Sequence, residues 1–474
     1  MKQHSRWLIL TLLAIAQFMV VLDTSVANVA LPAIQKALHF DASTLQWVIS
    51  AYALTFGGFL LLGGRAADLF GRRRTLVTGI VGFTIASLLI GISQSPVEII
   101  TLRAVQGMAA ALMSPSALSI VLTTFREGKA RNTALGIWST VAAGGAAAGL
   151  VVGGLLTQYL NWRWNFFINV PVGILSVISI LQVVPKHEST ATHRHLDLGG
   201  AALVTAGIMT LVYGLTEAPT WGWTSFGTLG FLASAAILLA GFVWNESRVS
   251  HPLMPLGILK NRNVAGANLM MMPIVAGMLG MFFLLSLYIQ TVMRYDPVTA
   301  GFSFLPFPLV LAVISNIVPR VVQRHGPRPF LVAGPLLLAA GLVWLSQLSL
   351  QSSYVIGILP AIILMAAGMG MSFVSVTIAA TSGVPAEEAG LASGMLNTSQ
   401  QMGGALGLAI LSGVSSSVML SSVRFSAVEA LLRGDKMAFT VAAGFAMVAV
   451  IFALTLIRTP KKTHTPISEP ITVH

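Results

Sequence analysis

The sequence contains no cysteine and very little charge. Without cysteine among its 474 residues, the chain can form no disulfide, thiolate nucleophile or cysteine-bound metal site. Only 9% of the residues are charged, whereas a soluble domain typically carries about 25%. The hydrophobic share is 55% and the mean hydropathy is +0.83. This composition predicts an integral membrane protein that crosses the bilayer many times.

Long polar segments are also scarce, which argues against an enzyme. The largest polar joins, 186–196, 246–262 and 415–437, are too short for a catalytic domain. No P-loop pattern is present, and all nine histidines fall in loops or tails, so we expect neither ATP-driven transport nor a metal site. A membrane-embedded enzyme would need several His, Ser, Glu or Asp side chains at one depth. It remains a remote alternative.

Fourteen apolar runs are long enough to cross a bilayer, since a span needs about 20 residues. They cover 7–30, 45–64, 75–93, 97–122, 133–158, 165–185, 197–217, 225–245, 263–291, 298–318, 329–349, 353–378, 390–414 and 438–457. With the N-terminus inside, the inner segments hold 20 of the 27 Lys and Arg residues. The outer loops hold six, namely Lys36, Arg163, Arg294, Arg424, Arg433 and Lys436. The positive-inside rule therefore places both termini in the cytoplasm, and the net charge of +12 reflects topology rather than nucleic-acid binding.

One carboxylate interrupts the first apolar run. Asp23 lies seven residues before the outer end of that run, and Arg103 lies six residues after the outer start of the fourth. At about 1.5 Å per residue, both lie roughly 10 Å below the outer surface and can share one polar pocket. Burial favours the protonated carboxyl group, whereas a neighbouring guanidinium favours the carboxylate. The pair is therefore either a site that binds and releases a proton or a structural ion pair between two helices.

Polar residues also share helical faces in two other places. In the fourth run, Gln106 and Ser114 fall on the same face as Arg103, which predicts a protein-facing surface. In the thirteenth run the corresponding residues are Asn397, Gln400 and Gln401. We expect Gln106 and these three residues to line a substrate cavity, although hydrogen bonding between helices would explain the second set equally well.

A faint repeat divides the chain. The loop "GGRAADLFGRRR" (63–74) follows the second run, and "IVPRVVQRHGPRP" (317–329) follows the tenth. Aligning Gly71 with Gly326 also brings Arg73 opposite Arg328. Related halves are common in secondary transporters. The sequence therefore predicts an N-terminal six-helix bundle (1–185), a linker with two extra transmembrane helices (186–255), and a C-terminal six-helix bundle with a short cytoplasmic tail (256–474).

Four motifs carry a resemblance to a known family. The pattern G-x-x-x-D-x-x-G-R-[KR] is met by Gly64, Asp68, Gly71, Arg72 and Arg73, and R-x-x-Q-G is met by Arg103, Gln106 and Gly107. The others are "LDTSVANVALP" (22–32) and "WRWNFFINVPVG" (162–173). Together they resemble the major facilitator superfamily, in its fourteen-span drug:proton antiporter branch of the EmrB/QacA type. The resemblance implies an all-α fold of two six-helix bundles plus two extra central helices.

The resemblance also assigns expected roles to residues. It implies that Asp23 and Arg103 couple transport to protons. It implies that the loop carrying Gly64, Asp68, Gly71, Arg72 and Arg73 is a conformational latch. In the fifth run the antiporter motif G-x8-G-x3-G-P-x2-G-G is met by glycines at 136, 145, 149, 153 and 154, with Leu150 at the proline position. We expect Gly145, Gly149 and Gly153 to form a stripe for close helix packing.

The implied function is export of hydrophobic or amphipathic small molecules in exchange for protons, by alternating access. Such a protein would lie in the plasma (inner) membrane, as a monomer, and would use the proton gradient and no cofactor or metal. Its expected partners are the small-molecule substrate, protons and membrane lipid. A narrow exporter of one metabolite, such as an antibiotic, pigment or siderophore, is the alternative within transport.

Overall fold

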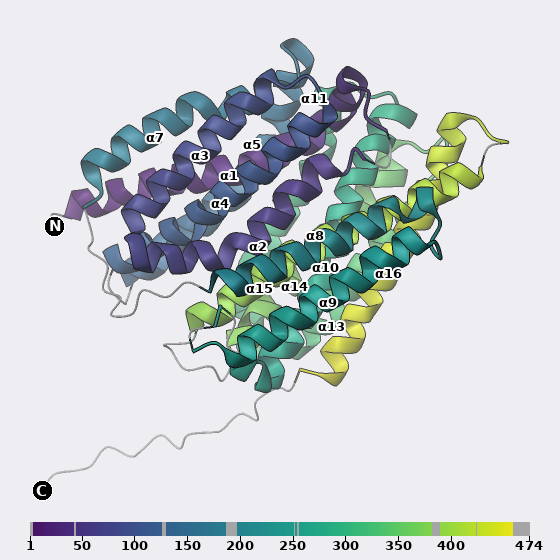
Figure 1. Cartoon of the computed structure of the whole chain (residues 1–474). Coiled ribbons are helices and arrows are strands. Elements are labelled where there is room, and N and C mark those ends of the chain that lie inside the picture. The colour runs from purple at the N-terminus through teal and green to yellow at the C-terminus, as the bar shows by residue number, and fades with distance from the viewer. Residues whose placement is uncertain are drawn as a thin grey trace, which may run out of the picture.

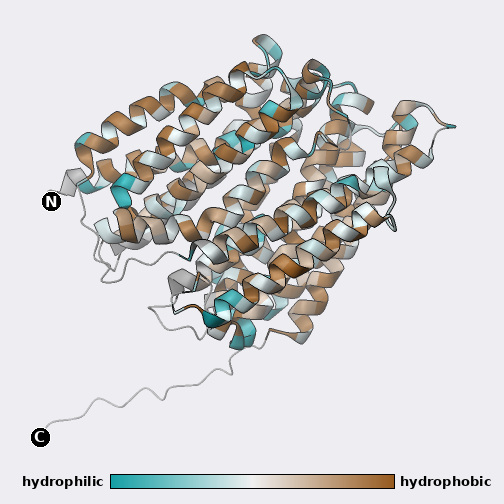
Figure 2. Cartoon of the chain, in the orientation of Figure 1, coloured by the Kyte–Doolittle hydropathy of each residue, from teal (hydrophilic) through white to brown (hydrophobic). Residues whose placement is uncertain are grey.

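The computed structural model describes residues 3–41, 44–125, 129–185, 197–250, 252–253, 256–381, 389–422 and 424–457. Every regular element in these residues is a helix. Twelve of the helical segments are long and apolar enough to cross a membrane. Figure 2 shows mostly hydrophobic helices with hydrophilic residues gathered near their ends. The prediction of a multi-pass, all-α membrane protein is confirmed.

The first seven helices pack together. They are α1 (Gln3–Leu38), α2 (Trp47–Phe70), α3 (Arg72–Ile92), α4 (Pro96–Thr124), α5 (Lys129–Tyr159), α6 (Trp164–Phe167) and α7 (Asn169–Val183). Helix α4 lies against α2 and α3, α1 lies against α5, and α7 lies against α3 (Figure 1). Helix α4 begins where Ser95 accepts a hydrogen bond from the Glu98 amide and Pro96 occupies the first helical position, which is a strong start signal.

The remaining helices form a hairpin and a second group. The hairpin is α8 (Leu198–Trp221) and α9 (Phe226–Arg248). The second group is η1 (Leu256–Lys260), α10 (Arg262–Leu287), η2 (Tyr288–Val292), α11 (Pro297–Phe304), α12 (Pro306–His325), α13 (Arg328–Leu345), η3 (Tyr354–Ile358), α14 (Leu359–Thr381), α15 (Ala389–Ser421) and α16 (Ala427–Thr455). Within it, α10 packs on α15 and α16, and α13 packs on α14 and α16.

Two glycines at aligned positions turn the chain in the same way. Gly71 separates α2 from α3 with φ of 93°, and Gly326 separates α12 from α13 with φ of 79°. A side chain would be strained at a positive φ of this size, so glycine is required at both turns. The alignment of the two loops, weak in sequence alone, therefore has a matching backbone feature in each half.

The two groups of helices are joined at one end of the molecule. We call the end where α1 begins and α16 ends the near end, and the opposite end the far end (Figure 1). At the far end, Ser286 of α10 donates to the Asn28 carbonyl of α1 (2.9 Å), and Gln290 of η2 donates to the Val29 carbonyl (3.1 Å). One large apolar cluster combines the second half of α1 with the second group of helices and also includes a few residues of α2–α6. A separate cluster nearer the other end contains residues from α1–α7 only.

Helix α8 lies over the seam between the groups. Its Ile208 and Val212 share an apolar cluster with Leu54 of α2 and with Ala405 and Ala409 of α15. Helix α9 packs on α8. The extra hairpin therefore contacts both halves through one of its two helices.

A buried hydrogen-bonded triad reinforces this seam at the far end. The Gln46 side chain, just before α2, donates to the Thr216 hydroxyl of α8 (2.8 Å). It also accepts a hydrogen bond from the Ser412 hydroxyl of α15 (2.5 Å). All three side chains are buried. A single glutamine thus links both groups of helices to the hairpin.

The predicted boundaries differ from the structure at more than one loop. Helix α1 runs to Leu38 and includes Lys36, which was expected in an outer loop. Another difference lies at the expected outer loop 415–437. Helix α15 continues to Ser421, and α16 begins at Ala427. A capping box between Ser426 and Glu429 starts α16. The charged residues near position 435 broke the apolar run, but the first turns of a helix tolerate such residues. Arg433 and Lys436, expected in an outer loop, are therefore helical.

Candidate functional site

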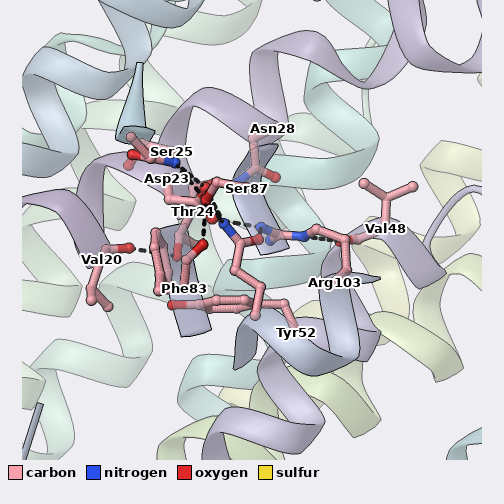
Figure 3. Close-up of polar contacts among 12 residues, drawn as sticks. Val20, Asp23, Thr24, Ser25, Asn28, Val48, Tyr52, Phe83, Ser87 and Arg103 are labelled. Carbon is pink, nitrogen blue, oxygen red and sulfur yellow. Dashed lines mark hydrogen bonds and ion pairs between the residues drawn. The ribbon is translucent and has the colours of Figure 1, made fainter. Parts of the chain in front are cut away.

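Asp23 and Arg103 form a completely buried ion pair. Arg103 Nη1 lies 2.5 Å from Asp23 Oδ2, and both side chains have an exposed fraction of 0%. Asp23 comes from the middle of α1 and Arg103 from the first half of α4, and the two point toward one another in Figure 3. The prediction that these two residues share one buried polar pocket is confirmed.

The second oxygen of Asp23 is also fully engaged. Oδ1 accepts hydrogen bonds from Gln106 Nε2 (2.9 Å) and from Asn169 Nδ2 (2.8 Å). Every partner of this carboxyl group is a donor. Such surroundings complement an ionised carboxylate and offset the large cost of burying its charge.

Arg103 is held on several sides. Its Nε donates to the Val48 carbonyl (2.8 Å), and its Nη1 also donates to Gln106 Oε1 (2.6 Å). The guanidinium lies 4.4 Å from the centre of the Tyr52 ring, a cation–π distance. Among the described residues, Nη2 has no hydrogen-bond partner. The arginine is therefore anchored firmly but retains one free donor.

The network reaches five helices. Ser87 of α3 accepts from Gln106 (2.8 Å) and from Asn169 (3.4 Å). A change in the charge of the Asp23 carboxyl group therefore alters contacts on five helices. Besides Ser87 on α3, the residues involved are Asp23 on α1, the Val48 carbonyl on α2, Arg103 and Gln106 on α4, and Asn169 at the start of α7.

Glycines bring the helices close enough for these contacts. A Cβ atom on Gly107 of α4 would collide with Thr55 and with the Tyr52 carbonyl of α2. On α5, a Cβ atom would lie 3.2 Å from Phe18 at Gly145, 2.6 Å from Ser25 at Gly149 and 2.8 Å from Val26 at Gly153. The expected glycine stripe therefore packs on the segment of α1 that carries Asp23.

The missing proline of the family motif leaves α5 unbroken. Leu150, at the proline position, is buried within the continuous helix Lys129–Tyr159. Its carbonyl oxygen faces Gly301 of α11, where a Cβ atom would collide with it. Helix α5 thus contacts the second half of the molecule through backbone at this point.

The four cavity candidates separate into two kinds. Gln106 is buried, and both of its polar atoms are used in the Asp23 network, so it does not face a substrate in this conformation. Asn397 is exposed and Gln400 and Gln401 are half-buried on α15. Gln401 lies against Gly57 of α2, at the seam between the two halves.

The latch residues lie at the near end, and their role stays a prediction. Gly71 forms the turn described above, and a Cβ atom on Gly64 would be in ordinary contact with Pro115 at 3.7 Å. Arg73 donates to the Leu181 carbonyl at the end of α7 (2.5 Å), a contact within the first group of helices. Arg72 is half-buried at the start of α3. Asp68 lies in α2, but its side chain is outside the described residues.

Three members of the site, Ser87, Tyr52 and Asn169, were not predicted from the sequence. Asn169 stands within the motif "WRWNFFINVPVG", so a signal for it was present, although no role was assigned to it. Ser87 and Tyr52 lie in apolar runs without a motif. Among the described residues, no group of three His, Cys, Asp or Glu side chains could hold a metal ion.

Comparison with known proteins now gives the family. The model of the Major Facilitator Superfamily matches residues 13–408. The chain belongs to this superfamily. It is 38% identical to the puromycin resistance protein pur8 of Streptomyces alboniger over 95% of this chain and 91% of that one. It is 37% identical to the tetracenomycin C resistance and export protein of Streptomyces glaucescens over 85% and 75% of the two chains.

A solved structure shares the fold. The inward-facing, unoccupied structure of a bacterial homologue of the human lysosomal transporter Spinster superposes with a TM-score of 0.71 and 16% identity, covering 97% of this chain and all of that one. At this identity the likeness shows the fold alone. The members of the superfamily matched here are transporters, so the prediction that the chain is not an enzyme is confirmed.

Proposed function

We propose that this major facilitator protein exports hydrophobic or amphipathic small molecules in exchange for protons, and that Asp23 is the proton-binding group. The observation that carries the proposal is the buried Asp23–Arg103 pair, in which one carboxylate accepts hydrogen bonds from three side chains. A group so costly to bury is usually functional within a membrane. The resistance and export proteins among the relatives support export as the direction of transport.

The proposed topology has fourteen membrane-spanning segments. Helices α2 and α5, of 24 and 31 residues, would cross the membrane in addition to the twelve qualifying segments. The excess of Lys and Arg in the segments at the near end makes this end cytoplasmic, with both termini inside and the protein in the plasma (inner) membrane. Residues 1–185 and 256–474 form the two bundles, and 186–255 carry the extra hairpin.

The structure then corresponds to an inward-facing state. The far-end contacts of α1 with α10, together with the Gln46 triad, would close the outer side. Along one face of α15, exposure falls from Asn397, which is exposed, through half-buried Gln401 to fully buried Leu408. The face that could contact a substrate is therefore open toward the proposed cytoplasmic side.

Coupling follows from the charge of Asp23. When Asp23 binds a proton, Arg103 loses its counter-charge, and the donors on Gln106 and Asn169 lose a charged acceptor. The free energy of the network therefore depends on protonation, and any conformation that arranges these helices differently has a different proton affinity. Protons entering from outside would drive the cycle, and substrate would leave in the opposite direction.

Narrow specificity is a second candidate. The relatives include a cephamycin export protein of Amycolatopsis lactamdurans, 38% identical over 86% of this chain, and the tetracenomycin protein, each named for one antibiotic. The Asp23 carboxylate is already neutralised by Arg103, which also suits neutral or monocationic substrates better than dicationic ones. On this reading the chain would export one such metabolite.

The test uses purified protein in liposomes that contain a pH-sensitive dye. A proton gradient is imposed, and lipophilic cations, neutral drugs and single antibiotics are added one at a time to wild type and to Asp23→Asn. We expect substrate-evoked proton flux in wild type and its loss in the variant. The matched control is Asp296→Asn, since Asp296 is an exposed carboxylate in a connection.

Each outcome has a distinct meaning. Flux that persists in Asp23→Asn would remove Asp23 as the proton site and leave the pair with Arg103 a structural one. A response to one antibiotic and to no other compound would favour the narrow exporter. Substrate movement without proton flux would overturn proton coupling.

A further inference from the structure

A second carboxylate is buried in the other half of the molecule. Asp435 lies in α16, eight residues after its first residue, Ala427, and its exposed fraction is 1%. At about 1.5 Å per residue this is roughly 12 Å along the helix from the far end. Asp23 and Asp435 thus lie in opposite halves of the molecule.

The surroundings of Asp435 differ from those of Asp23. Ser415 of α15 donates a hydrogen bond to Oδ1 (3.1 Å). Among the described residues, Oδ2 has no hydrogen-bond partner, and no Lys, Arg or His side chain forms an ion pair with this carboxyl group. A carboxylate buried in an apolar environment without a counter-charge is far more costly than a carboxylic acid.

The charged groups nearby do not supply a counter-ion. On α16 itself, Arg433 is exposed and stacks on the Phe425 ring at 3.6 Å, Lys436 is half-buried, and Glu429 caps the helix. On η2, Tyr288 is within electrostatic range of Asp435, but its hydroxyl donates to the Ser349 carbonyl (2.7 Å).

The other helices packed on α16 bring no nearer charge. Arg262 of α10 and Arg328 of α13 are the first residues of their helices, at the near end. The described part of α15 contains no Asp, Glu, Lys, Arg or His. Asp435 is thus isolated from full charges on the helices that bury it.

We propose that Asp435 is a second proton-binding site, separate from Asp23, that holds a proton while the far end is closed and releases it when the far end opens. The proposal rests on the alternating-access function above. The elements that bury Asp435 also close the far end. Helix α15 joins the Gln46 triad, which includes Thr216 of α8, through its Ser412. Element η2 contacts α1 through Gln290. Separation of these elements would admit water and allow the carboxylate to form.

The consequence is a pH-dependent outer gate. Protonated Asp435 is compatible with burial and stabilises the closed far end, whereas ionised Asp435 favours the open one. A single proton site of this kind changes the closed-to-open ratio by at most about tenfold for each pH unit. Protonation of Asp23 would also make the closed-to-open ratio depend on pH, so the contributions of Asp23 and Asp435 must be separated by mutation.

The experiment measures the width of the far end directly. The chain has no native cysteine, so spin labels can be attached to Ala37→Cys and Gln351→Cys, two exposed positions at the far ends of opposite halves. Distances between the labels are measured in lipid nanodiscs across a pH series. In an Asp23→Asn background, we expect the closed population still to fall as the pH rises, and this dependence to vanish when Asp435→Asn is added.

Controls and contrary outcomes are defined in the same background. Asp296→Asn, which alters an exposed far-end carboxylate, should leave the pH dependence unchanged. Ser415→Ala removes a hydrogen bond from the carboxyl group and should shift the midpoint, which provides a second test if Asp435→Asn fails to fold. A distance distribution in Asp23→Asn that is insensitive to pH would overturn the proposal. So would pH dependence that survives in the double variant. Neither result depends on finding a substrate, so failure to observe export would be a separate finding.

Discussion

The Asn169 side chain offers the sharpest test of the Asp23 site. Asn169→Ala removes one of the two hydrogen bonds to Asp23 Oδ1, a 2.8 Å contact that is fully buried. A hydrogen bond to a charged group contributes about 1.5–3 kcal/mol. Because this donor favours the ionised form and one pH unit corresponds to about 1.4 kcal/mol, its loss should make Asp23 bind a proton more readily by about one to two pH units.

The assay is the pH profile of substrate-driven proton flux in liposomes. We expect the midpoint of the profile to move toward higher pH in Asn169→Ala by about one to two units. The matched control is Asn165→Ala. Asn165 is also buried and lies four residues earlier, but it donates to the Thr157 hydroxyl (2.6 Å) and does not contact Asp23.

The reasoning would be refuted by a lower rate with an unchanged midpoint in Asn169→Ala. That result would mean that Asn169 stabilises the structure without setting the protonation of Asp23, or that another group titrates. An equal shift in Asn165→Ala would show that any buried change near α6 and α7 moves the profile. The hydrogen bond to Asp23 would then not be its cause.

Three further predictions concern packing, gating and pH. Gly149→Val should lower the melting temperature, because its Cβ would lie 2.6 Å from the Ser25 side chain and overpacking costs about 1–3 kcal/mol. Gly144→Val, in open space on the same helix, should have little effect. Gln46→Leu loses two buried hydrogen bonds, so the closed-to-open ratio measured with the far-end spin labels should fall about five- to thirtyfold; an unchanged ratio would exclude Gln46 from the gate. Asp296→Ala should reduce thermal stability at pH 7 through loss of the cap of α11, by about 1 kcal/mol. Because hydrogen bonds from Thr299 hold the pKa of Asp296 below its usual value, this stabilisation is present above about pH 4 and is lost as the pH falls through the folded-state pKa, so the melting curves of variant and wild type should converge in acid.

Much of the fold could be predicted because a bilayer imposes simple rules. Apolar length and the placement of Lys and Arg indicated the helical segments, and twelve of them qualify in the structure. One boundary error, at 415–437, arose because Arg433, Asp435 and Lys436 interrupt the apolar run, whereas the capping box at Ser426 starts α16 before these residues. Hydropathy counts residues one at a time, whereas a helix end depends on a few specific hydrogen bonds.

The site could be predicted only in part, for a related reason. Helical rise placed Asp23 and Arg103 at one depth, but their contact also depends on the lateral positions of α1 and α4. The neutral side chains that complete the network are set by the rotation and lateral position of five helices. No single stretch of the sequence indicates these two quantities. Asn169 was visible within a motif, but nothing in the sequence indicated that its amide reaches α1.

The two buried carboxylates show how the same residue type can serve a transporter differently. Asp23 is surrounded by donors from α4 and α7, which stabilise its charge and distribute the effect of protonation over five helices. Asp435 has one hydroxyl partner, and its Oδ2 has none among the residues that the structure describes, so its surroundings favour the neutral form in this conformation. If both bind protons, the proposed inward-facing state combines an ionised group in one half with a protonated group in the other. Opening the far end would then release a proton from Asp435 to the outside, whatever Asp23 does, and would make the outer gate respond to external pH independently of the coupling step.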